Sequence, residues 1–167
     1  MCDDPAGGDD FEQLSRPARK GPSLKARAVA FLSRREYSRL ELQRKLAAHA
    51  QDAAEVEQLL DQLERENWLS DERFAQSLIH RRASVRGAAR IAQELKQHGL
   101  SPSRIADLRE GLRQTELQRA RAVWQKKFGQ APSDPKEYAR QFRFLASRGF
   151  SPDCLRRILG EPDDPAG

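Results

Sequence analysis

Residues that favour β-sheet are scarce in this chain, and their scarcity constrains its fold more than any other feature of the sequence. Only nine of the 167 residues are Val, Ile or Thr, whereas Ala and Leu number 22 and 19. β-Branched side chains are enriched in strands, while Ala, Leu, Arg, Glu and Gln favour helices. We therefore predict an all-α protein.

Helix-capping residues and apolar stripes divide the middle of the chain into nine expected helices. The stripe is clear at Val56, Leu60 and Leu63, which recur at the spacing of one helical face. The expected helices cover residues 24–35 and about 87–98, and seven others begin after the N-caps Ser38, Asp52, Ser70, Ser101, Thr115, Asp134 and Ser151.

Two short strings recur fifty residues apart: Gly-Leu-Ser-Pro at 99–102 and Gly-Phe-Ser-Pro at 149–152. Units of about this size bury little surface alone and gain stability by stacking. We therefore predict three tandem three-helix repeats in an elongated, curved arrangement. The predicted division is a disordered acidic tail at 1–23, repeats at 24–70, 71–115 and 116–160, and a disordered acidic tail at 161–167.

No set of residues in the chain has the composition or spacing of a catalytic or metal site. His49, His80 and His98 stand in no metal-ligand spacing with one another or with a cysteine. Cys154 is expected to be a small buried apolar residue, and Cys2 falls in the N-terminal tail. No glycine-rich phosphate loop is present either. We expect no enzymatic activity, no metal and no cofactor.

The sequence also predicts where the protein resides. No apolar run approaches the about 20 residues of a membrane span, and the acidic N-terminus lacks the apolar core of a signal peptide. The two cysteines are too far apart to form a disulfide framework, which favours a reducing compartment. We expect a monomer in the cytoplasm, with no contact to a membrane.

The 30 basic and 25 acidic residues are distributed unevenly along the chain. Residues 24–70 are neutral overall, whereas 71–115 carry a net charge of +4 and 116–160 carry +6. The two tails are acidic, with −2 at 1–23 and −3 at 161–167. A basic surplus in two adjacent units suits a polyanion or an acidic protein surface as the partner.

Each predicted repeat carries a basic pair at the end of its first helix, and stacking would place these pairs along one face. With further cations of the later repeats, the predicted basic face comprises Arg34, Arg35, Arg81, Arg82, Arg86, Arg90, Lys96, Lys126, Lys127, Arg140, Arg143, Arg148, Arg156 and Arg157. Such a face could follow a phosphate backbone or bind an acidic protein groove. An equally weighted alternative is that these charges merely complement helix dipoles on solvated surfaces.

Other interpretations stay open. Phe31, Phe74, Trp124 and Phe142 are expected in the core, so aromatic side chains do not interleave with the basic positions as they would in a base-stacking platform. The helices around each repeated glycine resemble a helix-turn-helix, but Asp153 at the start of the last helix would repel phosphate. A DNA-binding protein without a protein partner and a purely helical adaptor are the rival classes.

Taken together, the sequence strings resemble those of the RecX family, the regulators of the RecA recombinase. The strings that carry the resemblance are Ser33 to Leu42, Lys45-Leu46, Trp68 to Ala75, Arg90-Ile91, Glu94-Leu95, Lys126 to Gly129, Phe144-Leu145 and Arg148 to Phe150. The resemblance covers residues 24–160, and the order and spacing of the strings make the match specific. The chain departs from the family pattern at Ala88, where Pro is frequent, and at Ala50, where Gly is usual.

The resemblance implies tandem three-helix modules that bind in the deep groove of the RecA–DNA filament. Such proteins block filament extension or promote disassembly, and they thereby lower the ATPase, strand-exchange and coprotease activities of RecA in homologous recombination, DNA repair and the SOS response. They have no known catalysis of their own. The expected partners are the RecA filament and, in addition, single- or double-stranded DNA. We expect the basic face of the second and third repeats to make the contact.

Overall fold

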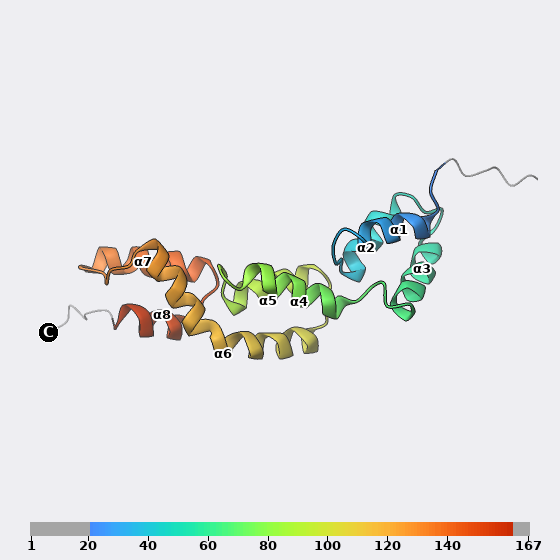
Figure 1. The fold of residues 1–167 in the computed structure, drawn as a ribbon. Helices are drawn as coiled ribbons and strands as arrows, with labels where there is room; N and C mark the ends of the chain where they lie inside the picture. Colours follow the sequence, from blue (N-terminus) through green and yellow to red (C-terminus); the bar gives the residue numbers. More distant parts are fainter. Residues whose placement is uncertain (1–20, 162–167) are drawn as a thin grey trace, which may run out of the picture.

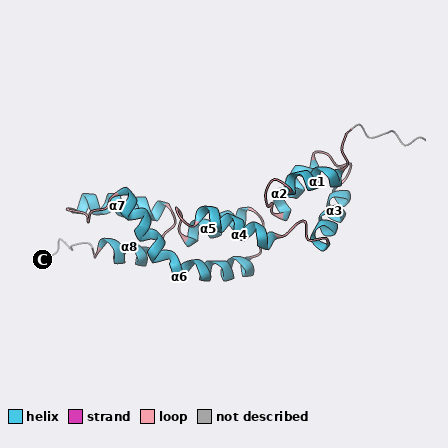
Figure 2. Cartoon of the chain, in the orientation of Figure 1, coloured by secondary structure: helices cyan, strands magenta, loops and turns pink. Residues whose placement is uncertain are grey.

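The structure, a computed structural model, describes residues 21–161, and this part of the chain is helical with no strand (Figures 1 and 2). The eight helices are α1 (Leu24–Leu32), α2 (Arg39–Ala47), α3 (Ala53–Arg65), α4 (Asp71–Arg82), α5 (Ala88–Gln97), α6 (Pro102–Lys127), α7 (Pro135–Ser147) and α8 (Pro152–Leu159). They form an elongated, bent array with α1–α3 at one end and α7–α8 at the other (Figure 1). The predicted all-α repeat architecture is confirmed.

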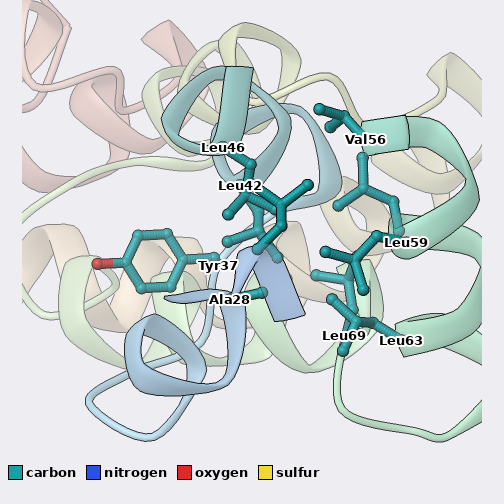
Figure 3. Close-up of a cluster of buried hydrophobic side chains, with 10 residues drawn as sticks. Ala28, Tyr37, Leu42, Leu46, Val56, Leu59, Leu63 and Leu69 are labelled. Atoms are coloured by element: carbon teal, nitrogen blue, oxygen red, sulfur yellow. The ribbon is translucent and has the colours of Figure 1, made fainter. Parts of the chain in front are cut away.

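Each group of three helices encloses its own small apolar core. The first core lies among α1, α2 and α3 and includes Tyr37, Leu42, Leu46 and Leu63 (Figure 3). The second is centred on Phe74 and the third on Leu145 and neighbouring residues. Because three separate cores replace one central core, the molecule can be long and thin, which leaves much of each repeat facing solvent.

The helices begin where the sequence places their caps. The side-chain oxygens of Ser38, Asp52 and Ser70 each accept a hydrogen bond from the backbone N–H three residues later. Ser101, Asp134 and Ser151 do the same for α6, α7 and α8, as predicted. Each cap satisfies a donor that would otherwise lack a partner inside the helix.

The prediction of nine helices was wrong at one point, because the sixth and seventh expected helices are the single helix α6. Thr115 was expected to cap a new helix. Instead its hydroxyl donates back to the carbonyl of Leu112, one turn earlier, as hydroxyl side chains within helices do. The surrounding residues are good helix formers without proline, so nothing stops the helix there. α6 therefore belongs to both the second and the third repeat, and the boundary predicted at 115/116 stays a prediction.

The predictions of disordered tails fall mainly on residues 1–20 and 162–167, which lie outside the described residues. Ser23, at the end of the predicted N-terminal tail, caps α1 by accepting the N–H of Ala26.

Candidate functional site

The residues of the predicted basic face divide according to whether a carboxylate compensates them. Four are paired: Arg35 with Glu41, Arg82 with Glu94, Arg140 with Glu137, and Arg156 with Asp153. Within residues 21–161 no carboxylate lies within ion-pair distance of the other ten, which are Arg34, Arg81, Arg86, Arg90, Lys96, Lys126, Lys127, Arg143, Arg148 and Arg157. All but Arg34 of these uncompensated cations belong to the second and third repeats.

Arg35 serves the structure of the first repeat. Its guanidinium lies 3.7 Å from the ring centroid of Tyr37 and hydrogen-bonds to both carboxylate oxygens of Glu41. The hydrogen bonds that Arg35 donates to Glu41 are the main reason that the pKa of Arg35 is raised. A cation held in this way by an aromatic ring and a carboxylate has little left to offer a partner.

Three of the uncompensated arginines meet at the junction between the second and third repeats. Arg86 and Arg90, from the start of α5, and Arg148, from the end of α7, line one cavity of about 390 Å³ together with Val85 and Ser147. We call these three arginines the junction cluster. Arg86 and Arg148 are half-buried and Arg90 is exposed. The sequence placed all three on the basic face but gave no sign that residues about sixty positions apart would converge.

Two glycines bring the repeats together at this point. The N–H of Gly87 donates to the carbonyl of Arg148 over 2.9 Å. A Cβ on Gly87 would lie only 2.2 Å from the carbonyl carbon of Gly149. A Cβ on Gly149 would lie 2.5 Å from the Cβ of Arg90. The two backbones therefore touch directly, and the close approach sets the geometry of the junction cluster.

Two charged residues of α6, the buried Glu116 and the half-buried Arg119, contact the same junction. Glu116 is 4% exposed, and its Oε1 accepts the N–H of Ala88 at the first turn of α5 over 2.9 Å. Arg119, one turn along α6, donates to the carbonyls of Ala83 and Arg86 at 2.8 and 2.6 Å. Burial lowers the pKa of Arg119, although Glu116 acts in the opposite direction. These contacts satisfy the free end groups of two helices at once.

Sequence reasoning missed Glu116 and Arg119. A signal was nevertheless present: Leu112, Glu116 and Ala120 occur four residues apart and all three are buried. A charged residue on an otherwise apolar helical face indicates that an unsatisfied group of another element lies opposite it. The assumed helix break at Thr115 concealed this face.

Cations and aromatic rings also associate in the third repeat, contrary to the expectation that they would not interleave. Phe128 and Phe144 pack edge to face with centroids 5.2 Å apart. The guanidinium of Arg148 lies 4.1 Å from the Phe144 centroid, Lys127 approaches the same ring at 5.8 Å, and Arg140 lies 5.5 Å from Phe128. The rings hold these cations in place through cation–π attraction.

Lys96 faces a different hollow. It lines a groove of about 620 Å³ between α5 and α6, together with Leu100, Ile105, Arg109 and Arg113. The cations at 34 and 35 lie in the first repeat, which meets the second through few contacts, among them the ion pair between Glu36 and Arg73. The predicted basic face is therefore not one continuous site.

Two negative findings concern the part of the chain that the structure describes. Between residues 21 and 161 no three His, Cys, Asp or Glu residues come together in a way that could hold a metal ion. Across the same range, no helix has both the length and the apolar character needed to cross a bilayer.

Comparison with known proteins shows which sequences and structures this chain is similar to. Residues 70–107 match the family model described as RecX, second three-helix domain, and residues 114–159 match that of the RecX third three-helix domain. The regulatory protein RecX of Ralstonia nicotianae is 53% identical over 141 residues, which cover 84% of this chain and 89% of that protein. The regulatory protein RecX of Pseudomonas putida is 42% identical over 146 residues, covering 84% and 92%.

Solved structures show the same fold at lower identity. A crystal structure of regulatory protein RecX aligns with a TM-score of 0.68 at 22% identity, over 83% of this chain and 74% of that one. RecX from Lactobacillus salivarius aligns with a TM-score of 0.69 at 18% identity, over 81% and 91%. With three-helix domains matched in place and sequence identity sustained over most of its length, this chain belongs to the RecX family of regulatory proteins.

Proposed function

We propose that this chain is a negative regulator of RecA that binds the RecA–DNA filament in the cytoplasm as a monomer. By occupying the filament it blocks extension, and it lowers the ATPase, strand-exchange and coprotease activities without catalysing a reaction itself. Membership of the RecX family supports the regulatory role. Nine cations of the predicted face in the second and third repeats have no carboxylate partner among the described residues, and they are the observation that carries the binding mode, because unneutralised positive charge attracts an acidic groove or a polyanion.

The elongated shape suits this role physically. A chain of small repeats presents a long surface that can bridge neighbouring protomers of a filament (Figure 1). A ligand that binds one state of an assembly more tightly than another shifts the assembly towards that state, by as much as its two affinities differ. Bridging contacts exist only where protomers are correctly spaced, so the chain can discriminate among filament states.

The function is tested by titrating the protein into RecA assembled on single-stranded DNA and following steady-state ATP hydrolysis. A decrease well below equal stoichiometry supports capping of filament ends, and a decrease only near equal stoichiometry supports occupancy along the groove. An unchanged rate, with the protein shown to be folded by circular dichroism, contradicts the proposal. It would leave the alternative of a helical DNA-binding protein that acts without RecA.

The face is tested by reversing the charges of Arg81, Arg82 and Arg86 together. We expect weaker inhibition and a shallower salt dependence, since exposed charge attraction is screened by salt. Because Arg82 pairs with Glu94, the double variant Arg81→Glu/Arg86→Glu, which keeps this ion pair, is measured alongside.

The matched control changes the same number of charges in the first repeat, at Arg27, Arg44 and Arg65, none of which lines the junction cavity. Inhibition that survives the triple change at 81, 82 and 86, or that falls equally in the control, rejects this face as the contact.

A further inference from the structure

We infer that the junction cluster of Arg86, Arg90 and Arg148 is a binding site for the phosphodiester backbone of a nucleic acid strand. The cluster is an anion site in composition. Its cavity is lined by Arg86, Arg90 and Arg148 with Ser147 and Val85, and by no carboxylate residue. Guanidinium groups bind phosphate oxygens through paired hydrogen bonds, whereas the Ser147 hydroxyl already donates to the carbonyl of Phe144.

A second cavity adjoins the first and shares two of its arginines. It measures about 300 Å³ and is lined by Arg86, Arg90, Gln93, Glu94 and Gln97. The one carboxylate here, Glu94, pairs through Oε1 with the guanidinium of Arg82 at 3.2 Å, while its buried Oε2 has no hydrogen-bond partner among the described residues. Arg86 and Arg90 therefore stand between two hollows, each of which offers hydrogen-bond donors.

Two adjoining anion sites fit a ligand whose charge repeats along a chain. A nucleic acid strand presents one phosphate per nucleotide, and successive phosphates can occupy the two hollows while sharing the arginines between them. Val85, which is 49% exposed, supplies an apolar surface at the edge of the cluster for a sugar. No aromatic ring lines either hollow, so the site is expected to hold the backbone without reading bases.

The cluster is held in place before any ligand arrives. Arg148 packs on the ring of Phe144, the backbone of Arg86 is fixed by Arg119, and Arg90 approaches the side chain of Gln93 at 3.4 Å. The direct contact of Gly87 with Gly149 fixes the distance between the two repeats. Side chains that are already ordered lose less conformational entropy on binding, which favours affinity.

This inference deepens the proposed function, since it names the ligand of one part of the basic face, but it is tested without RecA. A fluorescently labelled oligothymidylate is titrated with the full chain over a range of salt concentrations, and anisotropy is followed. The test variants are Arg90→Ala and the double variant Arg90→Ala/Arg148→Ala. Arg121→Ala is the matched control, because Arg121 is exposed on α6, lies outside the predicted basic face, lacks an ion-pair partner among the described residues and lines neither hollow.

We expect Arg90→Ala to weaken binding about tenfold, the effect of one lost charge-assisted hydrogen-bonding group. The slope of log affinity against log salt should fall by about 0.7 for each phosphate contact removed from a single strand. Arg90→Lys keeps the charge but not the paired geometry, so it should weaken binding while the slope stays. Arg121→Ala should change affinity less than about twofold, in keeping with a weak exposed charge.

Three outcomes overturn the inference: the wild-type chain does not bind the oligonucleotide; the cluster variants weaken binding no more than Arg121→Ala does; or polyglutamate displaces the oligonucleotide as effectively as unlabelled DNA of equal charge. The last result would assign the cluster to an acidic protein surface. Since RecA is absent from the experiment, loss of this inference leaves the ATPase test of the proposed function intact.

Discussion

Gly87→Ala is the substitution whose effect follows most directly from the geometry of the junction. At its φ of −77° and ψ of 167°, Gly87 has a backbone conformation that alanine adopts freely. From the unfolded chain alone, the exchange would stabilise the protein by about 0.4–1 kcal/mol, because alanine restricts the unfolded backbone. Any destabilisation must therefore come from lack of space.

The junction has no space for a Cβ at position 87. The added Cβ would lie 2.2 Å from the carbonyl carbon and oxygen of Gly149, whereas carbon atoms in contact normally lie about 3.5–4.0 Å apart. The two backbones must separate, which costs about 1–3 kcal/mol for overpacking. Separation also breaks the hydrogen bond from Gly87 to Arg148, worth about 1 kcal/mol. After the gain from the unfolded state is subtracted, we expect a net loss of about 2 kcal/mol.

Thermal unfolding followed by circular dichroism measures this loss. For a chain of this size, about 2 kcal/mol corresponds to a Tm lower by about 4–8 °C. Gly111→Ala is the matched control, since Gly111 lies inside α6 and nothing occupies the 4 Å around its added Cβ. Relief of a glycine within a helix should raise stability by about 0.5–1 kcal/mol. A Tm for Gly87→Ala equal to or above that of the wild type would show that the contact with Gly149 accommodates a Cβ without cost.

Three further substitutions test other contacts. Trp124→Phe removes the indole N–H that donates to Oε1 of the buried Gln141 over 2.7 Å. It should lower the free energy of unfolding in urea by about 1–3 kcal/mol. A change below about 0.5 kcal/mol would show that the amide oxygen finds another donor. Arg39→Ala removes a guanidinium that pairs with three carboxylates of α3. It should lower the free energy of unfolding by about 1 kcal/mol at low salt and by less at 1 M salt. A loss independent of salt would contradict an electrostatic origin. Arg119→Met removes the guanidinium donor to the backbone carbonyls of Ala83 and Arg86 and should lower Tm, with hydrogen exchange rising first at the ends of α4 and α5; unchanged exchange there would contradict its bridging role.

The features that the sequence predicted correctly are local ones. Caps such as Ser38 and Ser101 accept a hydrogen bond from the backbone N–H three residues later, and the apolar stripe of α3 is a property of one helix. Gly99 and Gly149, the recurring helix stops, both have the positive φ, 83° and 87°, that glycine adopts most easily. Local signals of this kind also carry the family resemblance, so the fold class followed from them.

The features that the sequence did not reveal depend on distant partners. Thr115 followed by Gln118 has the pattern of a capping box, but the pattern cannot show whether the preceding turn continues. Glu116 acquires its role only when α5 is brought to it. At Ala88, where the RecX pattern often has proline, the chain has a backbone N–H that donates to Glu116, and proline would lack this donor.

The candidate site shows the same division between local and distant signals. The positions of the basic residues were evident from the sequence, but which of them are compensated was not. Arg140 pairs within its own helix, at a spacing that the sequence displays, whereas Arg82 reaches Glu94 in the next helix. The junction cluster joins two repeats through a glycine contact sixty residues apart, and no spacing within either repeat indicates it.

The affinity of the chain for the assembled filament is the most direct test of its proposed role as a regulator of RecA. The chain, labelled with a fluorophore, is titrated with RecA filaments formed on single-stranded DNA with a slowly hydrolysed ATP analogue, and in parallel with the same DNA alone. If the chain is a regulator of RecA, we predict that the filament is bound at least about tenfold more tightly than the bare strand, a difference of about 1.4 kcal/mol. Equal affinity for bare DNA, or no binding to the filament, would contradict a role as a regulator of RecA.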